Sequence, residues 1–246
     1  MTVATIHRRF GPRTLSKGKP LRSVGADAVP HIPTGFPALD RALGIGGLPK
    51  GRICEIVGLA TSGKTTLALK CLEQAQAQKA RGQVAYVDQA LYFDPDYAYR
   101  CGLDLSRLLV GTSHDLQEAL AITEALVRSG SLAAVVFEAL DFFWSEPLAT
   151  SLLTATLGRL PPFLARSDTI LLVLHESPDC NSPALSTLAH TAAVRLRVVR
   201  ERWLRQGGDV RGYEARVEVL KNRHGPAGRA VQIAIKFNGT LRGNGL

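Results

Sequence analysis

Apolar and polar positions divide the chain into three parts with different periods. Residues 1–30 show little apolar periodicity and are interrupted by Gly11, Pro12, Gly18, Pro20, Gly25 and Pro30. This composition predicts a flexible arm, with the fold starting near residue 31. From there short apolar runs alternate with helical patterns, and the last third alternates polar and apolar residues.

The middle part predicts a parallel sheet covered by helices on both faces. We expect strands over residues 52–57, 83–88, 108–110, 132–138 and 169–175, and helices over 64–80, 95–101, 115–129 and 149–159. Residues 132–137 and 169–174 are continuous apolar runs, as strands buried on both faces require. Strands alternating with helices indicate an α/β fold whose central sheet is mainly parallel.

Polar and apolar residues alternate in three segments of the last third, as in strands with one face exposed to solvent. The segments are residues 192–204, 211–221 and 229–237. Turns rich in glycine separate them, including residues 206–209. They predict antiparallel strands toward the C-terminus.

A complete phosphate-binding loop occupies residues 58–66, between an apolar strand and a helical run. The predicted nucleotide contacts come from Gly58, Ser62, Gly63, Lys64, Thr65 and Thr66. Backbone N–H groups of such a loop converge on phosphates, the lysine reaches the β- and γ-phosphates, and the first threonine ligates Mg²⁺. The helix dipole adds to the attraction. The alternative is a chance match, which the flanking strand and helix disfavour, so we expect ATP and Mg²⁺ as cofactors.

Composition fits one globular domain, with 46% hydrophobic and 21% charged residues. The four cysteines are scattered without metal-binding spacing, and we expect reduced thiols. No apolar run approaches the length that spans a bilayer, and the basic N-terminus lacks an apolar signal core. The expected location is the cytoplasm, without membrane attachment.

Positive charge is concentrated near both ends of the chain. Residues 1–22 hold six Lys or Arg and no acid, and residues 195–229 hold 10 basic and 4 acidic side chains. Residues 23–194 hold 12 basic and 17 acidic side chains, a net of −5. Two basic segments around an acidic body predict a nucleic-acid surface. A solvated arm and ordinary charged strand faces are the alternative.

Several motifs in order give this chain a specific resemblance. They are residues 32–40, 46–52, the phosphate loop, Val87-Asp88, residues 94–98, residues 126–130 and residues 214–223. Together they resemble the core of the RecA recombinases over roughly residues 31–237. The resemblance implies a RecA-like ATP-binding core over residues 31–246 and no separate C-terminal domain.

The resemblance also shows where hydrolysis is in doubt. In RecA proteins a glutamate two residues after the aspartate matched by Asp88 positions the attacking water, and this chain has Ala90 there. Loss of a general base costs about 10²–10⁴-fold in rate. Asp88 is an outside candidate for the base. Glu138 stands where the family has an aspartate that holds the Mg²⁺ water, although pairing with a basic neighbour is an alternative role.

The sensing and DNA-binding segments of the family are altered too. His175-Glu176 stands at the Asn-Gln pair that senses the γ-phosphate, and we expect His175 to be merely hydrogen-bonded. The first DNA loop is missing, because residues 142–147 run straight into the next helix. The second would be residues 177–190, which hold no Lys or Arg.

If DNA binds, the basic segments would therefore contact its phosphates without reading sequence. The candidate contacts are Arg8, Arg9, Arg13, Lys17, Lys19, Arg22, Arg195, Arg197 and Arg205. The last three have no acid beside them in the sequence. Trp203 and Phe237 could stack on bases, or belong to the core.

Subunit contacts are half retained in the resemblance. Lys221 and Arg223 match the family's lysines that reach a neighbour's triphosphate, with exposed strand cations as the alternative. The family's N-terminal polymerisation helix is not expected in the Gly- and Pro-rich arm. An end-capping subunit or a partner of RecA is expected in preference to an independent filament.

Short RecA-like chains of this architecture resemble the ImuA group, accessory proteins of error-prone translesion synthesis. This implies a nucleotide-binding regulator of DNA repair in the DNA-damage (SOS) response, with RecA or translesion polymerase components as partners and weak or no hydrolysis. The second hypothesis is a DNA-dependent ATPase that acts as a minimal recombinase in homologous recombination.

Overall fold

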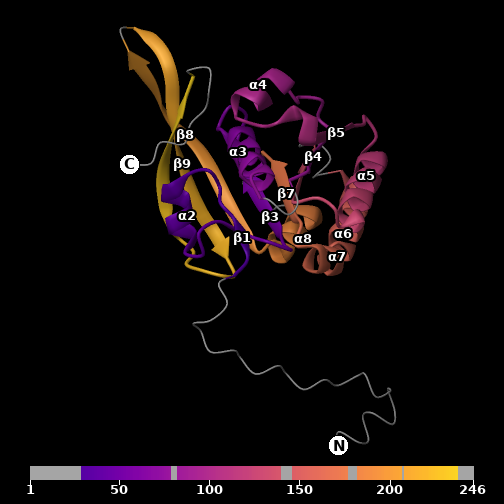
Figure 1. Ribbon diagram of the computed structural model, residues 1–246. Coiled ribbons are helices and arrows are strands. Elements are labelled where there is room, and N and C mark those ends of the chain that lie inside the picture. The colour runs from indigo at the N-terminus through magenta and orange to yellow at the C-terminus, as the bar shows by residue number, and fades with distance from the viewer. Residues whose placement is uncertain (1–28, 79–81, 140–145, 177–181, 207, 238–246) are drawn as a thin grey trace, which may run out of the picture.

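A computed structural model describes residues 29–78, 82–139, 146–176, 182–206 and 208–237. Its centre is an eight-stranded sheet in the order β10-β9-β8-β3-β7-β6-β4-β5 (Figure 1). The strands from β8 to β5 along this order run parallel, and β9 and β10 are antiparallel to their neighbours. The predicted α/β fold with a mainly parallel sheet is confirmed.

Every residue of the four central strands is buried, which explains their continuous apolar sequences. They are β3 (Ile53–Val57), β7 (Ile170–His175), β6 (Ala134–Glu138) and β4 (Val84–Asp88), with β5 (Leu108–Thr112) at the edge. Side chains alternate between the two faces of the sheet. Ile56 packs in one core cluster and Ile53 in the other.

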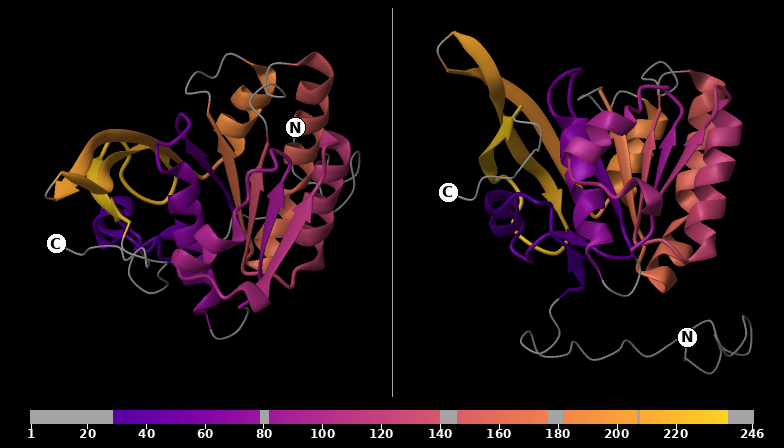
Figure 2. Two further views of the ribbon diagram at one scale, coloured as in Figure 1. Left: turned by 90° about the horizontal axis from the view of Figure 1, so that it is seen from above. Right: turned by 45° about the horizontal axis from the view of Figure 1, so that its top comes forward.

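Helices cover both faces, as predicted (Figure 2). One face carries α2 (Pro37–Leu43), α3 (Lys64–Gln76) and α4 (Pro95–Arg100). The other carries α5 (Leu116–Ser129), α6 (Pro147–Arg159), α7 (Pro161–Ser167) and α8 (Pro183–Thr191). A short 3₁₀ turn, η1 (Leu105–Arg107), leads into β5.

Helices α2, α7 and α8 and the small pair of β1 (His31–Ile32) with β2 (Leu48–Pro49) are absent from our sequence prediction. The correction matters most for α8. Residues 183–190 are helical, so the expected DNA loop over 177–190 is wrong there, and 177–181 lie outside the described residues.

The last third forms β8 (Val194–Gln206), β9 (Asp209–Asn222) and β10 (Ala230–Lys236). β8 pairs with β9 along its whole length, and its start also pairs in parallel with β3. The far end of this β8–β9 hairpin projects beyond the sheet (Figure 1). The expected antiparallel strands are therefore present. In the described part of the chain no helix is long and apolar enough to cross a membrane.

Candidate phosphate-binding site

The loop between β3 and α3 has a backbone that only small residues allow. A Cβ atom on Gly58 would lie 2.5 Å from the carbonyl oxygen of Val198. Gly63 has a φ of 103°, in the left-handed region, and a Cβ there would lie 2.9 Å from the Tyr213 hydroxyl. The buried Ser62 stabilises the turn, because its Oγ accepts a hydrogen bond from the Lys64 backbone N–H at 3.4 Å. The predicted loop residues are thus brought into one turn.

The first turn of α3 is suited to hold an anion. Its N-cap is Gly63, whose position offers no side-chain cap, and its first turn contains no acid. By contrast, side chains of Asp94, Asp115 and Ser182 cap α4, α5 and α8. Uncapped N–H groups and the positive end of the helix dipole therefore face the loop, which is how helices bind phosphates.

Lys64 lies in this turn beside two carboxylates. Its Nζ is 2.9 Å from Glu176 Oε1 and 3.9 Å from Glu138 Oε1. The basic neighbour that we gave as an alternative partner of Glu138 is thus present, and it is the loop lysine itself. Glu138 also accepts a hydrogen bond from the buried Tyr86 hydroxyl. Burial raises the pKa of Glu138, against the opposing effects of Tyr86 and Lys64.

Asp88 and Glu138 are partners in register at the carboxyl ends of β4 and β6. Asp88 is buried, and its Oδ2 accepts from the Phe93 N–H at 2.7 Å. Phe93 fixes this carboxylate in place, and its other oxygen has no hydrogen-bond partner among the described residues. Mg²⁺ is commonly held by one or two carboxylates together with phosphates and water. Thr65 and Glu138 fit this donor set.

Ala90 lines the same cavity as Lys64, Glu138 and Glu176. The cavity has a volume of about 130 Å³ and also borders Tyr92, Ala139 and His175. Position 90 therefore faces the lysine and the carboxylates, but its methyl group cannot accept a proton. We interpret position 90 as the place of the missing base because it lines this cavity and because the RecA proteins that the chain resembles have a glutamate there.

Tyr97 is a site residue whose role sequence reasoning missed. Its hydroxyl lies 2.5 Å from Thr66 Oγ1, on the first turn of α3. Tyr213 approaches the same threonine from β9. Tyr97 lies in residues 94–98, which carried the resemblance, so the signal was present but unassigned.

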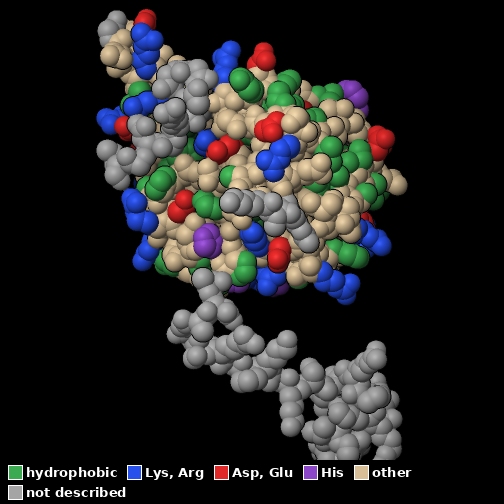
Figure 3. All heavy atoms as spheres, in the orientation of Figure 1, with side chains coloured by type: hydrophobic (Ala, Val, Ile, Leu, Met, Phe, Trp, Pro, Cys, Tyr) green, Lys and Arg blue, Asp and Glu red, His purple; other side chains and the backbone are tan. Residues whose placement is uncertain are grey.

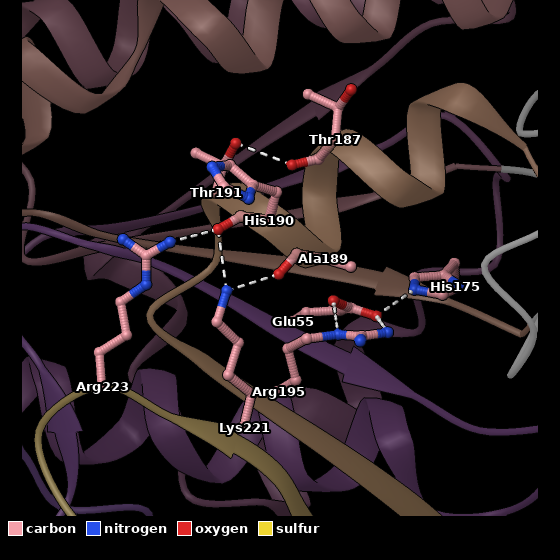
Figure 4. A network of polar contacts seen from close by, with 9 residues as sticks. All are labelled: Glu55, His175, Thr187, Ala189, His190, Thr191, Arg195, Lys221 and Arg223. Atoms are coloured by element: carbon pink, nitrogen blue, oxygen red, sulfur yellow. Dashed lines mark hydrogen bonds and ion pairs between the residues drawn. The ribbon is translucent and has the colours of Figure 1, made fainter.

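A buried ionic cluster lies behind the site, on the α8 face of the sheet (Figure 4). Glu55 accepts from His175 Nε2 at 3.0 Å and from Arg195 at 2.6 and 3.0 Å. Burial alone raises the pKa of Glu55, but the hydrogen bonds from His175 and Arg195 outweigh it, and the pKa is lowered. The expectation that His175 is hydrogen-bonded is confirmed.

Strand pairing places acids beside two of the candidate DNA contacts. Arg195 pairs with Glu55, and its side chain is only 16% exposed. Arg197 donates to Glu218 Oε2 at 2.7 Å. Both therefore have acidic partners across neighbouring strands, which sequence adjacency could not reveal. Arg195 is turned toward Glu55, which leaves little of its side chain exposed for a phosphate contact.

The exposed cations on the β8–β9 hairpin lie among acids (Figure 3). Arg202 pairs with Glu214, and Arg211 pairs with Asp209. Arg205 is exposed near the tip, and Trp203 and Phe237 are 44% and 45% exposed. Arg200 stacks over Trp203 at 4.3 Å and donates to Thr61 of the phosphate loop. The remaining DNA candidates, in residues 1–22, lie outside the described residues.

Lys221 and Arg223 lie at the end of β9, beside the C-terminal end of α8 (Figure 4). Lys221 Nζ donates to the Ala189 and His190 carbonyls at 2.6 and 2.8 Å, and Arg223 also donates to His190. Burial lowers the pKa of Lys221. The Arg223 backbone N–H donates to the Ala193 carbonyl, and the Ala193 N–H donates to the carbonyl of Ile53, the first residue of β3. The phosphate loop follows the other end of β3. These cations therefore cannot reach the phosphate loop of their own chain.

The comparisons with known proteins agree with this geometry. Residues 1–144 match the family model described as "RecA N-terminal domain". Protein RecA of Chloroherpeton thalassium is 34% identical over 261 residues, covering 96% of this chain and 71% of that protein. Protein RecA of Chloroflexus aurantiacus is 35% identical, covering 96% and 72%. A crystal structure of the RadB recombinase has the same fold, with a TM-score of 0.64 at 23% identity, covering 83% of this chain and 96% of that one.

Proposed function

The chain belongs to the RecA family, and from this premise we propose that it is an ATP-binding regulatory protein of DNA repair. In this proposal it is an ImuA-like accessory factor of translesion synthesis in the SOS response. It acts in the cytoplasm with RecA or translesion polymerase components. ATP and Mg²⁺ bind at residues 58–66, and hydrolysis is slow or absent.

One observation carries the proposal. The phosphate loop has an uncapped helix N-terminus and a buried lysine, while Ala90 lines the same cavity without a carboxylate. In this arrangement Lys64 and the α3 N–H groups bind the phosphates, and Thr65 and Glu138 hold the ion that neutralises their charge. Residue 90 cannot take a proton from water. The site therefore supports binding better than turnover.

Partner binding is proposed from the family, and the cations that would take part in it lie away from the phosphate loop. Lys221 and Arg223 would approach a triphosphate held by a second RecA-like subunit. They now donate to carbonyls at the end of α8, so contact with a neighbour would exchange these bonds.

A DNA-dependent ATPase acting as a minimal recombinase is the second candidate function. It is favoured by the intact Lys64-Thr65 pair and by the cations at the opposite end of the sheet. In that case Asp88, whose second carboxylate oxygen is buried without a described hydrogen-bond partner, or Glu138 would have to act as the base.

Steady-state ATP hydrolysis with and without single-stranded DNA tests the two candidates. We expect turnover well below ordinary ATPase rates of about 1 s⁻¹, with little stimulation by DNA. Lys64→Ala should abolish nucleotide binding. Turnover at or above about 1 s⁻¹ that depends on DNA and is lost in Lys64→Ala would establish the ATPase and exclude the regulatory role proposed here.

A further inference from the structure

We propose that Glu176 sets the nucleotide preference of this site. Its carboxylate occupies the position beside Lys64 that a γ-phosphate would take, and the site therefore favours a nucleoside diphosphate over a triphosphate. The inference rests on the proposed nucleotide site and deepens it. ATP still binds, but less tightly than ADP.

The contact between Glu176 and Lys64 is the first support. Glu176 Oε1 is 2.9 Å from Lys64 Nζ, whereas Glu138 is 3.9 Å away. The side chain of Lys64 is only 9% exposed, so its charge needs a partner inside the site. Glu176 supplies this partner from the end of β7. The lysine of a phosphate loop is the group that reaches the β- and γ-phosphates.

The surrounding charge is the second support. Glu138 also lies beside Lys64, and Asp88 is the partner of Glu138 in register on the neighbouring strand β4. Lys64 thus lies beside two carboxylates before any nucleotide enters. A γ-phosphate would add negative charge at the point where Glu176 already lies. A diphosphate ends before this point and leaves the pair of Glu176 with Lys64 intact.

Solvent exposure distinguishes Glu176 from the other two carboxylates, which are buried. Asp88 is held by the Phe93 N–H, and Glu138 by the Tyr86 hydroxyl. The Glu176 side chain is 36% exposed. It also borders both the cavity of about 130 Å³ at Ala90 and a second one of about 290 Å³ beside residues 58–62. Glu176 thus has open space beside it into which it would turn when a triphosphate enters, at the electrostatic cost of its contact with Lys64.

Glu176→Gln provides the direct test, because glutamine keeps the shape, removes the charge and can donate an N–H to a phosphate oxygen. Fluorescence titrations with mant-ADP and with mant-AMPPNP, both with Mg²⁺, give the two affinities. Glu124→Gln is the matched control, since Glu124 pairs with Arg128 and Arg159 on the far flank of the sheet. Circular dichroism melting of each variant checks folding.

We expect the wild-type protein and Glu124→Gln to bind mant-ADP about tenfold or more tightly than mant-AMPPNP. In Glu176→Gln the ratio should shift toward the triphosphate analogue by about tenfold. An unchanged ratio in a folded Glu176→Gln protein would overturn this inference and leave the nucleotide site standing. Absence of binding of either nucleotide to the wild-type protein would overturn the proposed nucleotide site itself.

Discussion

At the residue scale, the side chains that contact one another differ widely in how far apart they lie along the chain. Gly63, Lys64 and Thr65 are adjacent in the sequence, and their spacing alone predicts the phosphate-binding turn. Glu55 and Arg195 are 140 positions apart, and they meet because β3 and β8 are neighbouring parallel strands. The charge of Arg195 was visible in the sequence, but its partner was not.

The pair of Glu55 with Arg195 makes a strong prediction about stability. Arg195→Ala removes the arginine partner of the Glu55 carboxylate, which is 1% exposed and keeps its contact with His175. Breaking a buried ion pair costs about 3–5 kcal/mol, and we expect about 3 kcal/mol in urea unfolding. Arg202→Ala is the control, since Arg202 pairs with Glu214 at the surface and its loss should change the midpoint little. Equal midpoints for both variants would contradict a stabilising role of the cluster.

The same pair predicts the direction of a pH dependence. Because the folded pKa of Glu55 is lowered from its ordinary value of 4.5, its contribution is fully present above about pH 4.5. It is lost as the pH falls through the folded value. The wild-type protein should therefore lose stability on acidification more steeply than Arg195→Ala, in unfolding curves measured between about pH 6 and 3.

At the element scale, the strands were predicted well and several helices were missed. The apolar runs of β6 and β7 are long enough to be recognised without their neighbours. Helices α2, α7 and α8 are short, but each has proline in its first turn, and Ser182 caps α8. These start signals are local and could have been used. For α8 the family resemblance led instead to a loop.

The end of α8 gives a prediction for Lys221. Its Nζ donates to two carbonyls of the last turn, where a cation interacts favourably with the helix dipole. Lys221→Ala should therefore lower the free energy of unfolding by about 0.3–1 kcal/mol. Urea unfolding measures this, with the exposed Arg229→Ala as control. A loss of partner binding without any change in stability would instead assign Lys221 to contacts between subunits alone.

At the scale of the whole molecule, the topology brings the residues of the candidate site to the carboxyl ends of the central strands. The ends of β3, β4, β6 and β7 place the phosphate loop, Asp88, Glu138 and Glu176 together, although 118 positions separate Gly58 from Glu176. The sequence predicted these strands and a mainly parallel sheet. It could not predict that Glu176 would pair with Lys64, because that contact depends on the side chains of this chain alone.

Charge at this scale is less simple than the sequence indicated. The basic excess of residues 195–229 is spread over a hairpin where Arg197, Arg202 and Arg211 pair with acids. The exposed cations that remain, such as Arg205, are fewer than the count of basic residues implied. The expected polyanion surface thus depends more on residues 1–22, which hold six of the basic side chains.

We infer that this RecA-family protein keeps the phosphate site and lacks the carboxylate that activates water. Steady-state ATP hydrolysis by Ala90→Glu, beside the wild-type protein and the double variant with Lys64→Ala, tests it most directly. We predict that Ala90→Glu raises turnover by at least about tenfold, since a positioned base contributes about 10²–10⁴-fold, and that the double variant is inactive. Equal turnover in the folded Ala90→Glu and wild-type proteins would contradict the claim.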